Sequence, residues 1–267
     1  MKNILITGGA SGLGFATAKY FADKDYFVWV CDIKTGESYK NINYIKTDLT
    51  KSEDVKQAFD VVSKSTKSLD AIIHFAGIYV MSALTEIEEA VLKKMLDVNL
   101  LGCYRVNKQF LPLVQSGKII IITSEVAPLK PIPFNSIYSL TKTALDCYAH
   151  ALRMELSLLN IPVITVRPGA FSTQLLGASI NSMEDFCKNT KLYKHNAQKF
   201  RKIMSSNMKS KPAEKLAKLI FKINKKKSPK SIYKINNNIS LKLLNLLPSK
   251  CQSFVYKKLL KENKKTH

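Results

Sequence analysis

A serine, a tyrosine and a lysine stand close together between Gly117 and Leu145 and are able to share a proton. They are Ser124, Tyr138 and Lys142, with the lysine four residues after the tyrosine. A phenol with a pKa of about 10 is a poor base at neutral pH, but an ammonium group one helical turn away would lower that pKa. These residue types fit an acid–base relay in which the serine hydroxyl stabilises charge on a substrate oxygen. The alternative is an ordinary buried strand that leads into a helix carrying a surface Tyr–Lys pair.

A second group of residues is suited to holding phosphate. Thr7–Gly14 has the sequence TGGASGLG and separates a short apolar stretch from a helix-like one. Gly8, Gly12 and Gly14 allow a tight turn and a close approach of the backbone to a pyrophosphate, and the following helix N-terminus offers free N–H groups. The alternative is a simple strand-to-helix turn that binds nothing. A glycine loop alone is weak evidence, and the inference of phosphate binding rests on its position between a predicted strand and a predicted helix.

Asp32, at the end of the second apolar stretch, indicates which dinucleotide would bind. A carboxylate there accepts hydrogen bonds from the adenosine ribose hydroxyls and repels a 2′-phosphate. Ile33 follows it, and neither Ala10 nor Ser11 is basic, so the sequence favours NAD over NADP. Lys34 weakens that preference, and a turn at a strand end is the alternative role of Asp32.

These residues need a scaffold, and the hydrophobic pattern predicts one. Strands are expected at residues 3–7, 26–31, 43–46, 69–75, 118–123, 161–167 and 231–235. Helices are expected at residues 12–24, 52–67 (opened by Ser52 as an N-cap), 87–113, 136–160 and 212–224. We expect strands and helices to alternate, which predicts an α/β fold: a doubly wound parallel sheet (Rossmann fold) in a three-layer α/β/α arrangement.

Several short motifs, taken together, resemble a known family. They are TGxxxGxG at Thr7–Gly14, Asp32, Asp48-Leu49, Ala76-Gly77, Val98-Asn99, Ser124, YxxxK at Tyr138 and Lys142, and PGxxxT at Pro168–Thr173. Their order and intervals resemble the short-chain dehydrogenases/reductases of the long-established type, over about residues 1–175. The resemblance implies NAD(H)-dependent hydride transfer that interconverts a secondary alcohol and a ketone.

The resemblance also implies roles for individual residues. The implied catalytic residues are Asn99, Ser124, Tyr138 and Lys142. Asn99 would hold a water that links Lys142 to solvent, although a helix residue satisfied by backbone is its alternative role, and Lys142 would also hold the nicotinamide ribose. The implied cofactor-binding residues are Gly8, Ser11, Gly12, Leu13, Gly14, Asp32, Asp48, Leu49, Ala76, Gly77, Tyr138, Lys142, Pro168, Gly169 and Thr173. Asp48 and Leu49 would flank the adenine, and Thr173 would bind the nicotinamide carboxamide.

Two positions depart from the family pattern. Many members place the serine 13 residues before the tyrosine, where this chain has Glu125. A glutamate cannot replace a serine at neutral pH, so we infer one extra residue in the loop 125–133 and keep Ser124. Where the family usually has Asn-Asn before Ala-Gly, this chain has His74-Phe75. We expect His74 to tie the central sheet together through a ring nitrogen, with a pH-sensitive role as the alternative.

The segment after Pro168 suggests the kind of substrate. In this family it normally forms the substrate lid, and residues 171–208 supply six apolar side chains: Leu175, Leu176, Ile180, Met183, Phe186 and Tyr193. The stretches DVNLLGCYRVNKQFLPLV and PFNSIYSLTK resemble the hydroxysteroid and retinol branch. We therefore expect an apolar, steroid- or lipid-like alcohol or ketone. The alternatives are an NADPH-type 3-oxoacyl reductase and a non-catalytic NAD-binding regulator or membrane adaptor.

The net charge of +22 is concentrated at the C-terminal end. Residues 1–187 hold 19 Lys+Arg and 18 Asp+Glu, whereas residues 188–267 hold 23 basic and 2 acidic residues. We divide the chain into a catalytic domain, 1–237, and a basic amphipathic extension, 238–267. The extension has three possible roles. Its leucines pack on the protein's own helices, or they lie on an anionic membrane surface, or its lysines bind nucleic acid. Nucleic-acid binding is disfavoured because no recognition motif is present.

The remaining features bound the class of protein. The five cysteines are widely spaced without a CxxC pair, so neither a metal site nor a disulfide framework is expected, and reduced thiols in a cytoplasm fit best. No apolar run reaches the length of a membrane span, and MKNILITGG looks like a first strand rather than a signal peptide. From the family resemblance we expect a homodimer or homotetramer that pairs through residues 87–113 and 136–160.

Overall fold

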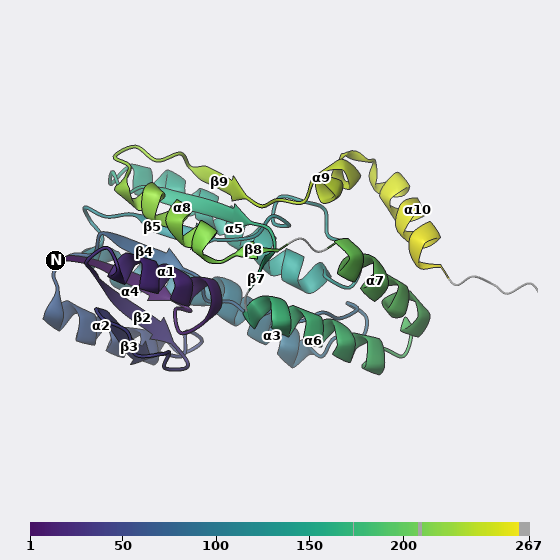
Figure 1. The fold of residues 1–267 in the computed structure, drawn as a ribbon, viewed down its shortest axis with the longest axis horizontal. Coiled ribbons are helices and arrows are strands. Elements are labelled where there is room, and N and C mark those ends of the chain that lie inside the picture. Colours follow the sequence, from purple (N-terminus) through teal and green to yellow (C-terminus); the bar gives the residue numbers. More distant parts are fainter. Residues whose placement is uncertain (173, 208–209, 262–267) are drawn as a thin grey trace, which may run out of the picture.

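One seven-stranded parallel sheet organises the chain, as the computed structural model shows for residues 1–172, 174–207 and 210–261 (Figure 1). The strand order is β3-β2-β1-β4-β5-β6-β9, and every neighbouring pair is parallel. The strands are β1 (Lys2–Thr7), β2 (Tyr26–Asp32), β3 (Ile42–Lys46), β4 (Ala71–His74), β5 (Ile119–Ile122), β6 (Val163–Pro168) and β9 (Ile232–Ile235). The order reverses between β1 and β4, so the predicted doubly wound Rossmann fold is confirmed.

Helices cover both faces of this sheet. They are α1 (Gly12–Ala22), α2 (Ser52–Ser65), α3 (Glu89–Leu96), the π-helical turn η1 (Asp97–Leu101), α4 (Gly102–Phe110), the 3-10 turn η2 (Leu111–Leu113), α5 (Ser136–Ser157) and α8 (Glu214–Lys225). Helices α1 and α8 pack on one face, while α2, α4 and α5 pack on the other. The strands are buried on both sides, which is why β4 and β5 are runs of purely buried residues.

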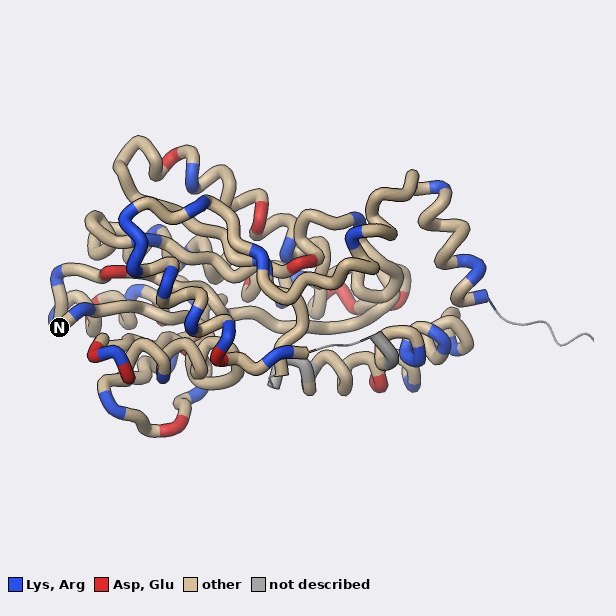
Figure 2. Tube along the Cα trace, turned by 45° about the horizontal axis from the view of Figure 1, so that its top comes forward, with Lys and Arg blue, Asp and Glu red and all other residues tan. Residues whose placement is uncertain are grey.

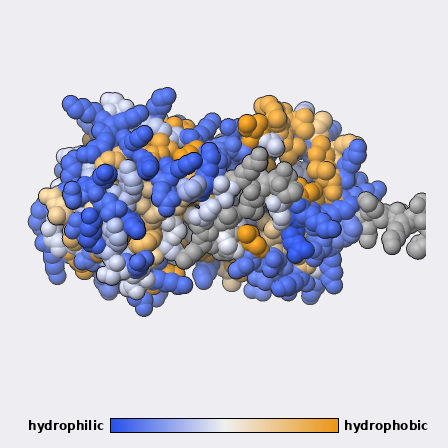
Figure 3. All heavy atoms as spheres, in the orientation of Figure 1, coloured by the Kyte–Doolittle hydropathy of each residue, from blue (hydrophilic) through white to orange (hydrophobic). Residues whose placement is uncertain are grey.

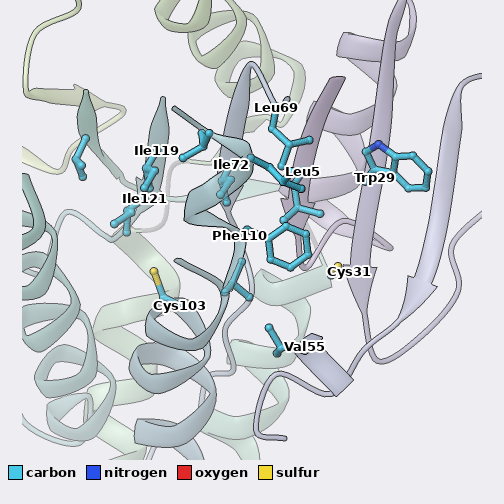
Figure 4. Packing of buried hydrophobic residues seen from close by; sticks show 14 of the residues in the cluster. Leu5, Trp29, Cys31, Val55, Leu69, Ile72, Cys103, Phe110, Ile119 and Ile121 are labelled. Carbon is cyan, nitrogen blue, oxygen red and sulfur yellow. The ribbon is translucent and has the colours of Figure 1, made fainter. Parts of the chain in front are cut away.

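A tightly packed core fills the face below α2, α4 and α5. Figure 4 shows Leu5, Ile72 and Ile119 on adjacent strands, with Phe110 of α4 next to Leu5 in the same cluster. The ring of Phe110 is fully buried and stands edge-on to Phe59 of α2, with ring centroids 5.4 Å apart. This packing fixes the helices that follow β4 and β5, and these helices carry the polar residues described below.

Two sequence predictions about local structure are wrong. Residues 33–41 form no helix, so β2 and β3 are joined by a loop and the expected alternation fails there. Ser52 is the first residue of α2 rather than its N-cap; Lys51 holds the cap position and makes no side-chain capping bond. The Asp54 carboxylate instead accepts a hydrogen bond from the backbone N–H of Asp48 at 3.0 Å.

A smaller helical layer lies beyond the carboxyl edge of the sheet. It consists of α6 (Gln174–Asn189), α7 (Lys194–Asn207), α9 (Ile239–Leu246) and α10 (Ser249–Leu260), with a short ribbon of β7 (Phe171–Ser172) and β8 (Lys211–Pro212) at its base. Figure 1 shows these helices at the end of the molecule opposite the N-terminus. Within the described ranges, no helix has the length and apolar character that crossing a bilayer requires.

Candidate active site

The predicted site residues gather at one edge of the sheet. In a parallel sheet all strands end on the same side, and ligands bind at the crevice where strand order reverses. Gly8, Asp32, Ala76 and Ser124 each end or follow a different strand, and Tyr138 comes from the first turn of α5 beside them. Segments far apart in the chain are therefore brought to one place.

The glycine turn after β1 leaves no room for side chains. Gly8 has φ +69°, and a Cβ added there would lie 2.6 Å from the backbone nitrogen of Ala76. Gly12 has φ +56°, and a Cβ on Gly14 would lie 2.1 Å from the carbonyl oxygen of Gly8. This bare turn at the N-terminus of α1 fits a pyrophosphate, since its backbone N–H groups can approach phosphate oxygens closely. Ser11 is the N-cap of α1 without a side-chain capping bond, and Leu13 packs on the core.

Asp32 is oriented by the same turn. One carboxylate oxygen accepts the backbone N–H of Ala10 at 3.0 Å, and the other accepts that of Lys34 at 3.2 Å. A carboxylate has about four acceptor positions, so the group keeps capacity for ribose hydroxyls. The backbone N–H of Lys34 bonds this carboxylate directly, which the sequence did not foretell.

The two residues predicted to flank an adenine are held differently. Asp48 uses its carboxylate locally, because Oδ1 accepts both the N–H and the hydroxyl of Thr50, and these bonds lower its pKa. Leu49 is only 5% exposed and belongs to the core, and its carbonyl accepts a bond from Arg105. Contact of either residue with an adenine stays a prediction.

Ser124, Tyr138 and Lys142 are brought together. The Ser124 hydroxyl interacts with the Tyr138 phenol and favours its ionised form. Lys142 is 5% exposed, and its Nζ lies 5.8 Å from the centre of the Tyr138 ring while donating to the carbonyl of Ile122 at 3.2 Å. Lys142 is therefore buried and Tyr138 is partly buried, so the two do not form a surface pair.

Burial dominates the acid–base properties of this group in the protein without a dinucleotide. It raises the pKa of Tyr138 to about 12, against a smaller lowering by Ser124. Burial also lowers the pKa of Lys142 to about 8. The expected lowering of the tyrosine pKa concerns Lys142 acting together with an oxidised nicotinamide ring, and it stays a prediction.

Asn99 sits at an irregular point of its helix. It lies in the π-helical turn η1, a feature found mostly at functional sites. Its Oδ1 accepts the N–H of Ile78 at 2.7 Å, and its Nδ2 donates to the Ile78 carbonyl and to Thr141, each at 3.0 Å. A Cβ added to Gly77 would lie 3.3 Å from Asn99 Oδ1 and 3.6 Å from Lys142 Nζ. The side chain thus fastens the loop after β4 to α5, next to the lysine.

Glu125 does not take the place of the serine. Its carboxylate accepts the backbone N–H of Asn238, at the start of α9, and its own N–H bonds the carbonyl of Pro168 at 2.8 Å. The phenol of Tyr138 interacts with Ser124 instead. The geometry therefore favours Ser124 despite its longer spacing.

His74 ties the sheet to a helix rather than to another strand. Its Nε2 lies 2.8 Å from Oδ1 of Asn107 in α4, while Nδ1 is buried without a hydrogen-bond partner among the described residues. Burial lowers the pKa of His74 to about 4, so the ring is neutral at pH 7.

Two residues of the site were not identified from the sequence. Thr141 binds Asn99, and its place within YxxxK was the available signal. The ring of Tyr79 packs against that of Tyr138 with centroids 4.9 Å apart, and burial raises its pKa. Nothing in the sequence beyond its position after Ala-Gly distinguished Tyr79.

The apolar residues of the predicted lid pack largely on one another. Met183 and Phe186 are 4% and 6% exposed, in a cluster that includes Phe134 and Phe200. Tyr193 is partly buried against that cluster, whereas Ile180 is exposed. Nothing is described for the side chains of Leu175 and Leu176.

The last predicted cofactor residues follow β6. Pro168 is buried, and Gly169 fits tightly, since a Cβ there would lie 2.0 Å from the carbonyl oxygen of Asn236. Thr173 lies outside the described residues. Among the residues that are described, no three His, Cys, Asp or Glu side chains cluster as metal ligands would.

Comparison with known proteins identifies the family. The family model "short chain dehydrogenase" matches residues 2–184. A 3-amino-tetrahydro-pyrrolizinone reductase of Xenorhabdus hominickii is 28% identical over 89% of this chain and 87% of its own length. Estradiol 17-beta-dehydrogenase 2 of Mus musculus is 30% identical over 66% of this chain, but the match spans only half of that enzyme.

Solved structures agree with this assignment. A short chain dehydrogenase family protein from Francisella tularensis superposes with a TM-score of 0.74 at 26% identity, covering 88% of this chain and 97% of that one. A structure titled "ElxO with NADP Bound" gives a TM-score of 0.71 at 25% identity, covering 88% and 96%. The chain therefore belongs to the short-chain dehydrogenase family of oxidoreductases, which use nicotinamide dinucleotides.

Proposed function

We propose that the chain interconverts a secondary alcohol and a ketone on an apolar, steroid- or lipid-like substrate, with NAD(H) as its dinucleotide. The observation that carries the proposal is the joint placement of Ser124, Tyr138 and Lys142 at the sheet edge beside the glycine turn. A protein that only bound a dinucleotide would need the turn but not a tyrosine paired with a buried lysine. The non-catalytic alternative is thereby disfavoured.

In this proposal each residue of the relay has a separate task. When bound, the nicotinamide supplies or accepts the hydride. Tyr138 donates the proton to the ketone oxygen in reduction and removes the hydroxyl proton in oxidation. Ser124 donates a hydrogen bond to the substrate oxygen. Lys142 keeps positive charge near the phenol and holds the nicotinamide ribose, while Asn99 positions Lys142 and links it to solvent.

The preference for NAD rests on Asp32. Its carboxylate stands at the end of β2 and is held by backbone N–H groups, so a 2′-phosphate placed there would meet negative charge. Because the chain is also similar to a structure with NADP bound, a preference for NADP over NAD is the alternative to test. Gly8, Gly12 and Gly14 would approach the pyrophosphate, and Ala76, Gly77, Pro168, Gly169 and Thr173 would line the rest of the dinucleotide.

The test is a spectrophotometric panel. Purified protein is given NAD or NADP in turn with hydroxysteroids, retinol, 3-hydroxyacyl esters and simple secondary alcohols, and the reduced-nicotinamide absorbance is followed. Turnover of a steroid or lipid alcohol with NAD is expected. Preference for NADP would reject the role of Asp32 and favour a 3-oxoacyl reductase. Binding of a dinucleotide without turnover of any compound would favour the non-catalytic alternative.

We also propose that two or four copies assemble through the long helices. The outer face of α5 carries an apolar stripe at helical spacing: Leu140, Ala144, Cys147, Ala151, Met154 and Leu158. Leu140, Met154 and Leu158 are 45%, 52% and 83% exposed in the single chain. Burial of this stripe against a second copy would remove that apolar surface from water.

A further inference from the structure

The last two helices expose several large apolar side chains. On α9, Ile239, Leu243 and Leu246 follow one another at helical spacing and are 70%, 61% and 79% exposed. On α10, Phe254 and Leu259 are 67% and 48% exposed. Figure 3 shows the resulting hydrophobic surface over these two helices. Five large apolar side chains therefore face water on neighbouring helices, which is unusual for a surface with no partner.

The other side of the same helices is packed. Leu260 is 6% exposed within the cluster of Phe134 and Phe200, and Gln252 donates to the carbonyl of Leu247 at 3.0 Å. Some leucines of the basic extension therefore pack on the protein, and others are exposed. The sequence hypothesis that they all serve the protein's own core is correct for only part of them.

Positive charge surrounds the exposed face. Residues 238–261 contain no Asp or Glu, and their lysines are all exposed: Lys242, Lys250, Lys257, Lys258 and Lys261. Figure 2 shows further Lys and Arg on the neighbouring α7. Apolar side chains flanked by lysines match a bilayer that has an acyl interior beneath anionic headgroups. Two copies of the same face would instead bring like charges together.

The helices are also hydrogen-bonded to the loop that follows Ser124 and to α7. Glu125, next to Ser124, holds the backbone N–H of Asn238, and Lys130 bonds Asn245 and the Leu247 carbonyl of the α9 segment. Asn196 of α7 donates to the carbonyl of Leu260 at 2.8 Å. The exposed face is thus a fixed part of the layer above the sheet edge.

We propose that α9 and α10 form a docking surface for an anionic lipid bilayer. The exposed side chains of Ile239, Leu243, Leu246 and Phe254 enter the headgroup region, and the lysines pair with lipid phosphates. Docking holds the layer of α6, α7, α9 and α10 against the bilayer, so that a lipid-like substrate, which rests on the proposed function, would come to Ser124 and Tyr138 from the membrane. The docking surface itself stands on exposure and charge and does not depend on the proposed reaction.

The test is co-sedimentation of the full chain with vesicles of phosphatidylcholine alone or mixed with phosphatidylglycerol. Two double variants probe the surface: Leu246→Ser/Phe254→Ser and Lys257→Gln/Lys258→Gln. Their matched controls are Val61→Ser/Leu159→Ser, which removes exposed apolar groups elsewhere, and Lys56→Gln/Lys64→Gln, which removes equal charge from α2.

We expect wild-type protein to bind the mixed vesicles, and each docking variant to lose about tenfold in partitioning while its control stays within about twofold. Three results would overturn the proposal. One is absence of binding to the mixed vesicles. A second is an equal loss of vesicle partitioning in Lys257→Gln/Lys258→Gln and in its control Lys56→Gln/Lys64→Gln, while Leu246→Ser/Phe254→Ser binds like wild type. That result would indicate attraction by net charge alone. The third is self-association without vesicles that the apolar variant abolishes, which assigns the face to a second copy.

Discussion

At the scale of single residues, identity and spacing foretold which side chains meet, but not how burial shifts their pKa values. Ser124, Tyr138 and Lys142 lie together as expected, and in the protein without a dinucleotide burial raises the pKa of Tyr138 to about 12. The free-energy cost of burying an ionised phenol depends on all the groups that surround it in the folded protein, and these cannot be read from the sequence. Tyr79 illustrates the same limit, because only the folded loop after β4 places it on Tyr138.

His74 provides a pH-dependent prediction at this scale. Its pKa is about 4 in the folded protein against about 6.5 in an unfolded chain, so between these values the unfolded state binds more protons. Stability contributed by the neutral ring is therefore fully present above about pH 6.5 and is lost as the pH falls towards 4, by on the order of 3 kcal/mol.

The measurement is urea unfolding of wild type and His74→Asn between pH 4 and pH 7. An asparagine keeps a polar partner for Asn107 but does not titrate, so the variant should lose less stability on acidification than wild type. Parallel pH curves for the two proteins would show that His74 does not contribute to the acid sensitivity.

At the scale of elements, hydrophobic periodicity predicted the seven strands of the main sheet and the helices that cover it, because these elements are buried on one or both faces. The interruption of the helical stretch 87–113 by η1 was not predicted, since a π turn adds one residue without changing the composition. Strict alternation of strands and helices was also expected, but a loop at residues 33–41 joins β2 directly to β3.

The turn between β1 and α1 carries a second prediction. Gly8→Ala places a Cβ 2.6 Å from the Ala76 nitrogen and forces a positive φ on a residue that disfavours it. We expect dinucleotide affinity to fall at least about tenfold and unfolding free energy to fall by about 1–3 kcal/mol.

A matched control comes from the same chain. Gly177 lies in α6 with no atom within 4 Å of an added Cβ, so Gly177→Ala should leave both quantities close to wild type. Dinucleotide binding is measured by calorimetry and stability by urea unfolding. Wild-type affinity in Gly8→Ala would contradict the assignment of this turn to the pyrophosphate.

At the scale of the whole molecule, the doubly wound parallel sheet in three layers followed from the sequence, but the outer surfaces did not. Alternating strands and helices leave few topologies open, whereas the outward face of a helix depends on how the layer beneath it packs. The C-terminal leucines show this directly, since Leu260 is buried and Leu246 is 79% exposed within the same basic extension.

Assembly gives the prediction at this scale. Sedimentation velocity should show a dimer or tetramer of the 30.0 kDa chain. Leu140→Asp/Met154→Asp places charge in the α5 stripe and should shift the protein to the monomer, while Leu159→Asp, outside the stripe, should not. A wild-type monomer, or an oligomer insensitive to the double variant, would reject pairing through α5.

The central claim is that Tyr138 moves the proton in an NAD-dependent oxidation or reduction. The most direct measurement compares turnover by wild type and Tyr138→Phe on the best substrate of the panel, with NADH binding followed by fluorescence titration. Removing only the hydroxyl should lower kcat by at least about a hundredfold, the usual scale of acid–base catalysis, while NADH affinity stays within about threefold. Undiminished turnover by Tyr138→Phe would contradict the account, because the proton would then have another carrier.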